Sequence, residues 1–308
     1  MNPSPTHLSC TALLLLAMTA CSDAETQTGE TTTGRTVPQV YVVNYPLQYF
    51  AERIGGEAVQ VTLPAPGDED PAFWKPDPGM IARYQGADLI LQNGAGYAAW
   101  TATATLPMST VLDTSRAFAD RYIQIENAVT HTHGPEGDHS HGSTAFTTWL
   151  DPTLALEQAR AIAAALQARF PGLQQDFRGR FQALERDLLE LDRDLASVVA
   201  ADPRRPLLGS HPVYQYLARK YALNLHSVHW EPDEMPDDGE WENLQTLLAE
   251  HPAKVMLWEE EPIREVSERL RGRGVESLVF DPCGNVPEQG DFLVVMRQNV
   301  QNLRRAFQ

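Results

Sequence analysis

Short apolar runs alternate with longer segments of helical character, and this alternation constrains the fold more than any other feature of the chain. In the first half the runs are VYVVNY (40–45), VTLPAP (61–66), ADLILQNG (87–94) and STVLDTS (109–115). In the second half they are PLLGSH (206–211), LNLHSVHW (223–230), KVMLWEE (254–260) and ESLVFDPCG (276–284). Strands that alternate with helices form parallel sheets covered by helices, so the sequence predicts an α/β fold.

One helix is expected to be much longer than the others. Between 172 and 202, apolar side chains recur at spacings of three and four: Phe177, Phe181, Leu184, Leu188, Leu191, Leu195 and Val198. Such a stripe is the buried face of a single helix. We therefore predict two α/β lobes with parallel sheets, at 37–171 and 203–308, joined by one long rigid helix. Shorter helices are predicted at 151–170, 212–221, 241–251, 262–272 and 291–307.

Residues 1–20 have the features of a signal peptide. The apolar run from Thr11 to Ala20 is shorter than the roughly 20 residues that a membrane-spanning helix needs. It ends in small residues before Cys21, as in the lipobox of bacterial lipoproteins, and a threonine-rich flexible tether follows at 21–36. A buried N-terminal helix is the alternative, because no Lys or Arg precedes the run. We expect an extracytoplasmic, periplasmic protein anchored to the membrane by a lipid on Cys21.

The charge of the chain limits the partners that it can bind. Its 308 residues include 24 basic and 41 acidic side chains, so the formal net charge is −17. Binding to a phosphate backbone needs clustered Lys and Arg, so we expect no nucleic acid as partner. A negative field instead raises the local concentration of cations.

Four predicted strands of the second lobe end in residues that can bind a metal ion: His211, His229 with Glu231, Glu259 with Glu260, and Asp281 with Cys283. Ligands of open α/β sheets bind at the carboxyl ends of the strands. Imidazole and carboxylate together suit zinc or a related transition ion. The alternative is that these residues have structural roles: His211 and Asp281 would be turn or capping residues, and Cys283 would be a core residue.

A histidine-rich segment lies in the range 126–148, which we expect to be an exposed, mobile loop. Its four histidines, His131, His133, His139 and His141, form H-T-H and H-S-H pairs among acidic residues. Short tracts of this kind capture metal ions without a fixed geometry. We predict weak auxiliary capture here, with a solvated linker as the alternative.

Together these features resemble the zinc- and manganese-binding lipoproteins of bacterial ABC importers. The local matches are Ile54-Gly55-Gly56, Asp70-Pro71 with Pro76, Ala87-Asp88, Asn93-Gly94, Trp149-Leu150-Asp151-Pro152, Ser210-His211, Asp281-Pro282, Met296, Asn299 and Leu303. The resemblance implies a monomeric solute-binding protein that holds Zn²⁺, or Mn²⁺, in a cleft between the lobes. It also implies delivery of that ion to an ABC permease.

The chain departs from this family at two ligand positions. The family usually binds its ion with three histidines and a carboxylate, but Ala72 and Thr147 stand where two first-lobe histidines are expected. The resemblance thus carries over only His211 and Asp281. Three alternatives follow: His229, Glu259 and Cys283 complete a rearranged site, or a loop residue such as His131 or His133 enters the cleft, or the cleft takes another solute.

Under the third alternative, a metal chelate or other small solute would occupy a cleft lined by aromatic residues, namely Phe73, Trp74, Trp100, Trp230 and Trp258. An alternative from a different class of protein is that the chain is a secreted metallohydrolase, with Glu231 or Glu259 as general base. The sequence contains neither an H-E-x-x-H nor a G-x-S-x-G motif. Relatives of the family have also been associated with attachment, but no adhesive feature is visible. We expect a binding protein and not an enzyme.

Overall fold

A computed structural model describes residues 37–125, 130–132, 138–140 and 144–308. The predicted signal peptide, Cys21 and the tether lie outside the described residues, as do His133 and His141. Among the residues that the structure describes, no helix combines the length and the apolarity needed to cross a membrane.

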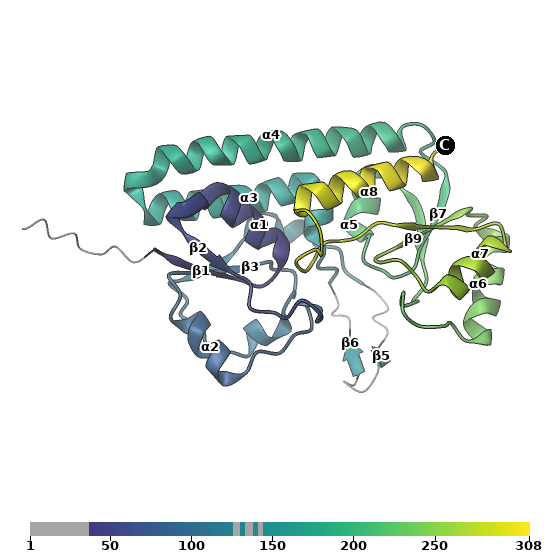
Figure 1. Ribbon diagram of the computed structural model, residues 1–308, viewed down its shortest axis with the longest axis horizontal. Coiled ribbons are helices and arrows are strands. Elements are labelled where there is room, and N and C mark those ends of the chain that lie inside the picture. The colour runs from purple at the N-terminus through teal and green to yellow at the C-terminus, as the bar shows by residue number, and fades with distance from the viewer. Residues whose placement is uncertain (1–36, 126–129, 133–137, 141–143) are drawn as a thin grey trace, which may run out of the picture. The chain divides into compact units, whose positions relative to one another are not determined.

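The first lobe is built on a four-stranded parallel sheet (Figure 1). Its strand order is β2-β1-β3-β4, with β1 Gln39–Val42, β2 Gln60–Thr62, β3 Leu89–Gln92 and β4 Val111–Asp113. Helix α1 (Tyr45–Gly55) follows β1 at once, because the Asn44 side chain accepts a hydrogen bond from the Leu47 amide and caps it. Helix α2 (Pro78–Gln85) starts in the same way after Asp77.

The second lobe repeats this plan. Its parallel strands are β7 Pro206–Gly209, β8 Asn224–Ser227, β9 Val255–Trp258 and β10 Glu276–Val279, in the order β10-β9-β7-β8. The helices between and after them are α5 Gln215–Tyr221, α6 Asp238–Glu250, α7 Arg264–Arg271 and α8 Phe292–Ala306. Two lobes with parallel sheets confirm the predicted α/β fold class.

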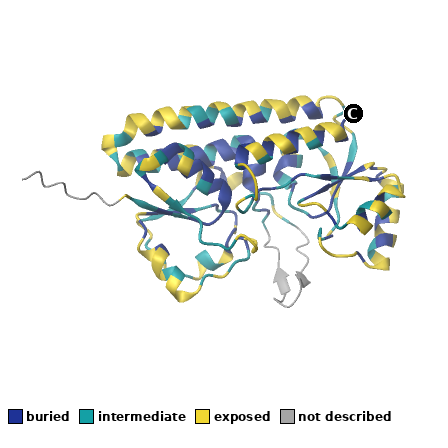
Figure 2. Ribbon diagram, in the orientation of Figure 1, coloured by how far each residue is buried: buried dark blue, intermediate teal, exposed yellow. Residues whose placement is uncertain are grey.

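The long helix predicted at 172–202 is α4, Gln174–Val199, with 26 residues. A short 3-10 turn at Pro171–Leu173 separates it from α3, Pro152–Arg169. Helix α4 packs along α3 and α1 of the first lobe and continues onto α8 and α5 of the second (Figure 1). The apolar stripe of α4 is its inner face, and every member except the partly exposed Phe181 is buried (Figure 2).

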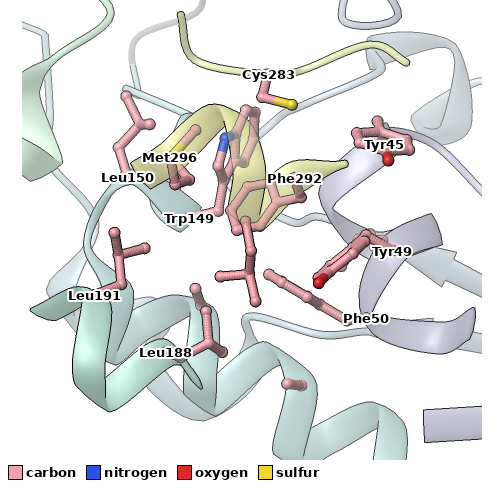
Figure 3. Packing of buried hydrophobic residues seen from close by; sticks show 14 of the residues in the cluster. Tyr45, Tyr49, Phe50, Trp149, Leu150, Leu188, Leu191, Cys283, Phe292 and Met296 are labelled. Carbon is pink, nitrogen blue, oxygen red and sulfur yellow. The ribbon is translucent and has the colours of Figure 1, made fainter. Parts of the chain in front are cut away.

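The hydrophobic core runs without interruption from one lobe into the other. Phe50 of α1 meets Phe292 of α8 edge to face, with ring centroids 5.4 Å apart, and Tyr49 lies 5.6 Å from the same ring (Figure 3). Leu188 and Leu191 of α4 belong to this cluster. Because α1 and α8 come from different lobes, the lobes are held together by buried apolar contact as well as by the long helix.

The segment predicted as an exposed loop at 126–148 is partly ordered, and that prediction is wrong at its end. The backbone forms two short antiparallel strands, β5 Thr130–Thr132 and β6 Asp138–Ser140, which place His131 opposite His139. Ala145, Thr147 and Thr148 are buried. The Ala145 carbonyl accepts a 2.9 Å hydrogen bond from the Tyr216 hydroxyl of α5, so this end of the segment is fastened to the second lobe.

Four further 3-10 helices complete the described chain: η1 Gly56–Ala58, η2 Ala99–Ala102, η3 Arg116–Arg121 and η5 Thr148–Leu150. The last of these leads directly into α3, whose N-terminus is capped by the Asp151 side chain. The remaining 3-10 segments connect strands and helices of the first lobe.

Candidate metal site

The carboxyl edge of the second sheet gathers the residues that were predicted to bind metal. The strand order places Asp281 after β10, Glu259 after β9, His211 after β7 and His229 after β8, one beside the next. Backbone hydrogen bonds fix the segment around His211: the Ser210 amide donates to Leu257 at 2.8 Å, and the Trp230 amide donates to Ser210 at 2.7 Å.

His211 is the buried centre of this edge, with 5% of its surface exposed. Its Nδ1 lies 3.1 Å from Oε1 of Glu231. A carboxylate that holds one ring nitrogen fixes the tautomer and orientation of a histidine and presents the other nitrogen as a metal ligand. The exposed ring of His229 stands edge-on to that of His211, at 5.7 Å between centroids. Glu231 is therefore the carboxylate that lies next to the His211 ring.

The protonation of the site depends on several carboxylates together. Burial acts to lower the pKa of His211, but the hydrogen bond to Glu231 and the charges of Glu259, Glu231 and Asp70 raise it above its ordinary value. Burial raises the pKa of Glu259 to about 8; the charge of His211 opposes this shift, and those of Glu231, Asp70 and Asp281 add to it. Protons are thus held in this site near neutral pH, and a divalent cation would compete with them.

Asp281 is positioned by the last helix. The buried Asn299 side chain of α8 accepts from the Asp281 amide at 3.0 Å and donates to its carbonyl at 2.7 Å. Oδ1 of Asp281 accepts from the Cys283 amide at 2.6 Å. Burial raises the pKa of Asp281, although this hydrogen bond opposes the shift. The side chain is therefore part of a turn and also lies close enough to Glu259 for its charge to act there.

Cys283 belongs to the core and not to the carboxylate group. Its side chain is buried with Tyr45, Trp149 and Phe292, and its sulfur lies on the side of Tyr45 (Figure 3). Burial, together with the charges of Asp281 and Asp291, raises the pKa of its thiol far above the ordinary value. A buried, protonated thiol is an inert core residue. This placement does not support the use of Cys283 as a ligand.

Residues 281–285, which we call the strap, fasten the second lobe to the first. The Trp149 indole donates to the Pro282 carbonyl at 2.7 Å, and the Tyr45 amide donates to the Gly284 carbonyl at 2.9 Å. The Asn285 side-chain amide donates to the carbonyls of Pro66 at 2.7 Å and Glu69 at 2.8 Å. The loop that carries Asp281 is thereby held against the first-lobe loop 63–74.

The two first-lobe positions without histidine are filled by packing. Ala72 is 6% exposed and Thr147 is 5% exposed. The Thr147 hydroxyl donates to the Val213 carbonyl at 2.5 Å, so it joins the lobes two residues beyond His211. Phe73 and Phe146, next to these positions, contact each other edge to face at 6.2 Å. At Thr147 the absent histidine therefore corresponds to a contact between the lobes, whereas Ala72 is packed in the hydrophobic core.

The predicted lining of the cleft is wrong for Trp230 and Trp258. Trp230 and Trp258 are buried in a second-lobe cluster together with Trp241, at 4.6 Å between the Trp230 and Trp241 rings. Trp74 and Trp100 pack in a first-lobe cluster that also contains Tyr84. Trp258 lies on β9 and Trp230 follows β8, and both point into the second lobe because burial of their large apolar surface is stabilising.

The candidate ligands follow neighbouring strands, but their side chains are not arranged around a common metal position. Within the part of the chain that the structure describes, no group of three or more His, Cys, Asp or Glu side chains is arranged to hold a metal ion. Of the loop histidines, His131 and His139 lie on β5 and β6, and His133 and His141 lie outside the described residues. Coordination in the cleft would need a further approach of the donors to the ion.

Several known proteins are similar to this chain over most of its length. The family model described as zinc-uptake complex component A, periplasmic, matches residues 40–306. The high-affinity zinc uptake system protein ZnuA of Bacillus subtilis is 25% identical over 310 residues, which cover 95% of this chain and 94% of that protein. The metal ABC transporter substrate-binding lipoprotein ScbA of Streptococcus cristatus is 21% identical over 307 residues, covering 94% of this chain and 96% of that protein.

Solved structures show the same fold. The metal-dependent lipoprotein YcdH from Bacillus subtilis superposes with a TM-score of 0.76 at 21% identity, covering 87% of this chain and 99% of that structure. The Zn(II)-bound ZnuA-like domain of AdcA from Streptococcus pneumoniae gives a TM-score of 0.75 at 19% identity, covering 87% of this chain and 98% of that domain.

Proposed function

This chain belongs to the family of periplasmic zinc-uptake complex components, a family of substrate-binding proteins, and we propose that it binds a divalent transition ion, zinc first, for delivery to an ABC permease. The observation that carries the proposal is the pair of the buried His211 with Glu231, at the sheet edge where Glu259 and Asp281 also lie. An imidazole oriented by a carboxylate, beside further carboxylates, is the donor chemistry of zinc sites.

In the proposed mechanism the protein binds the metal ion and transfers it to the permease, with no chemical step. The net charge of −17 attracts cations, and the ion displaces protons from His211 and Glu259 as it binds. Because the lobes share one core, we propose that the loops that carry the donors move rather than the lobes as whole bodies. Docking on the permease would release the ion by the same loop movement.

The parts of the chain outside the site fit this role. We propose that residues 1–20 are removed after export and that a lipid on Cys21 anchors the protein to the membrane. The loop histidines His131, His133, His139 and His141 would capture ions weakly and raise their concentration near the cleft.

The test is a calorimetric zinc titration of the protein at pH 7.5 and at pH 5.5. At pH 7.5 we expect one zinc ion to bind tightly in the cleft. At pH 5.5 the affinity should be at least about tenfold lower, because His211 has a raised pKa and the pKa of Glu259 is about 8, so both carry protons that the ion must displace. Since both groups lose their protons as the pH rises, the affinity increases with pH.

A variant without residues 131–141 separates the cleft from the histidine-rich tract. If the tight ion remains in that variant, the cleft holds it. The proposal fails if the tight ion disappears with the tract, if no tight ion binds at pH 7.5, or if the affinity is the same at both pH values.

A further inference from the structure

The first lobe has no histidine at either expected ligand position, but Asp70 lies in the first-lobe loop that the strap fastens to the second lobe. We propose that Asp70 is the first-lobe ligand of the transported ion, in place of imidazoles at Ala72 and Thr147. This inference rests on the proposed function, because it names a further ligand of the same site.

The local turn holds Asp70 at the carboxyl edge of the first sheet, in the loop between β2 and α2. Its Oδ1 accepts from the Ala72 amide at 2.8 Å, and its carbonyl accepts from the amides of Phe73 and Trp74 at 3.0 Å each. The carboxylate thus stands in a fixed turn two residues before the position where the family carries a histidine.

The strap holds this turn against the second lobe. Asn285 bonds the carbonyls of Pro66 and Glu69, and Glu69 is the residue directly before Asp70. The strap begins at Asp281, whose backbone is fixed by Asn299. One short segment therefore fixes both the loop that carries Asp70 and the loop that carries Asp281.

The effects of Asp70 on other groups agree with this placement. Its negative charge contributes to the raised pKa of His211 and to that of Glu259, which follow different strands of the second sheet. A single first-lobe carboxylate acts on both groups, so it lies near both of them.

Two buried hydroxyl groups, one in each lobe, are also without hydrogen-bond partners among the described residues. The Tyr97 hydroxyl of the first lobe is in a side chain only 5% exposed, and Asp70 adds to the raised pKa that burial gives it. The Ser210 hydroxyl, next to His211, is buried as well. Neither has a hydrogen-bond partner in the described part of the chain. Buried polar groups normally have partners, and water molecules bound to an ion would supply them.

A ligand set with Asp70 would be richer in oxygen than three histidines and a carboxylate. His211 would supply the imidazole, and Asp70, Glu259 and Asp281 would supply carboxylates. Carboxylate ligands suit manganese, whereas imidazole suits zinc. This site should therefore discriminate less between Zn²⁺ and Mn²⁺ than a site with three imidazoles.

The experiment is a calorimetric titration of Asp70→Asn with zinc and with manganese. An asparagine oxygen can still accept from the Ala72 amide, so the substitution removes the charge and keeps the turn. Asp68→Asn is the matched control, because it removes the same charge from another exposed residue of the same loop, two positions before Asp70. We expect Asp70→Asn to lower the zinc affinity about tenfold or more, and the manganese affinity further, whereas Asp68→Asn stays within about twofold.

Two results would overturn the inference. One is a wild-type zinc affinity in Asp70→Asn. The other is an equal loss for both ions together with a lowered melting temperature, which would make Asp70 a structural turn residue. Either result leaves the proposed function intact as long as the wild-type protein binds one tight ion in the cleft. If the wild type binds none, the proposed function itself fails.

Discussion

His211→Ala should lower the zinc affinity of the cleft by about 100-fold or more, because the only buried imidazole at the carboxyl edge of the described second sheet is then lost. Removal of the ring also leaves the Glu231 carboxylate without its 3.1 Å neighbour. The measurement is calorimetric titration at pH 7.5, with circular dichroism to verify that the variant is folded.

His226→Ala is the matched control for this substitution. His226 is exposed in the middle of β8, and its ring stacks on that of His251 at 4.4 Å rather than on His211. We expect its zinc affinity to stay within about twofold of the wild type, since a surface substitution away from the ligands leaves their geometry unchanged. An affinity of His211→Ala equal to that of the control would remove His211 from the site.

Trp149→Ala should destabilise the protein by about 3–5 kcal/mol, the usual cost of truncating a buried tryptophan. The indole is 2% exposed, contacts Tyr97 at 5.7 Å between rings and donates to the strap at Pro282. Its loss would create a cavity at the contact between the lobes and would leave the Pro282 carbonyl without this donor. Urea unfolding followed by circular dichroism measures the change in the free energy of unfolding.

Two further variants separate the contributions of Trp149. Trp149→Phe keeps an aromatic ring and removes the indole N–H, so we expect a loss of about 1–2 kcal/mol. Val286→Ala truncates an exposed side chain that follows the strap and should change stability by less than about 0.5 kcal/mol. If Trp149→Ala were as mild as Val286→Ala, the strap would not be a structural joint between the lobes.

The sequence was sufficient to predict the fold because each of the two patterns that define it lies within a short stretch of the chain. These patterns are the short apolar runs of the strands and the apolar residues spaced three and four apart in the long helix. Six of the eight strands of the two sheets lie within the apolar runs, β1 and β2 begin one residue before theirs, and α4 coincides with the longest apolar stripe. The strand-end rule also placed His211, Glu259 and Asp281 on one edge, because parallel strands all end on the same side of a sheet.

The contacts within the site are not local, and the sequence did not predict them. The pairing of Glu231 with His211 depends on how the chain turns after β8. Glu231 and His229 are two positions apart, so the alternation of side chains along a strand did not distinguish them. The bonds from Asn285 to Pro66 and Glu69 join residues more than two hundred positions apart. The burial of Thr147 follows from its bond to Val213, a contact that a polar, threonine-containing segment gives no reason to expect.

The most direct test of the account is a crystal structure of the zinc-loaded protein with anomalous scattering measured at the zinc edge. We predict one strong peak about 2.1 Å from the His211 ring nitrogen that faces away from Glu231, with carboxylate oxygens completing the coordination. A zinc peak bound only at the histidine-rich tract, with none next to His211, would contradict it.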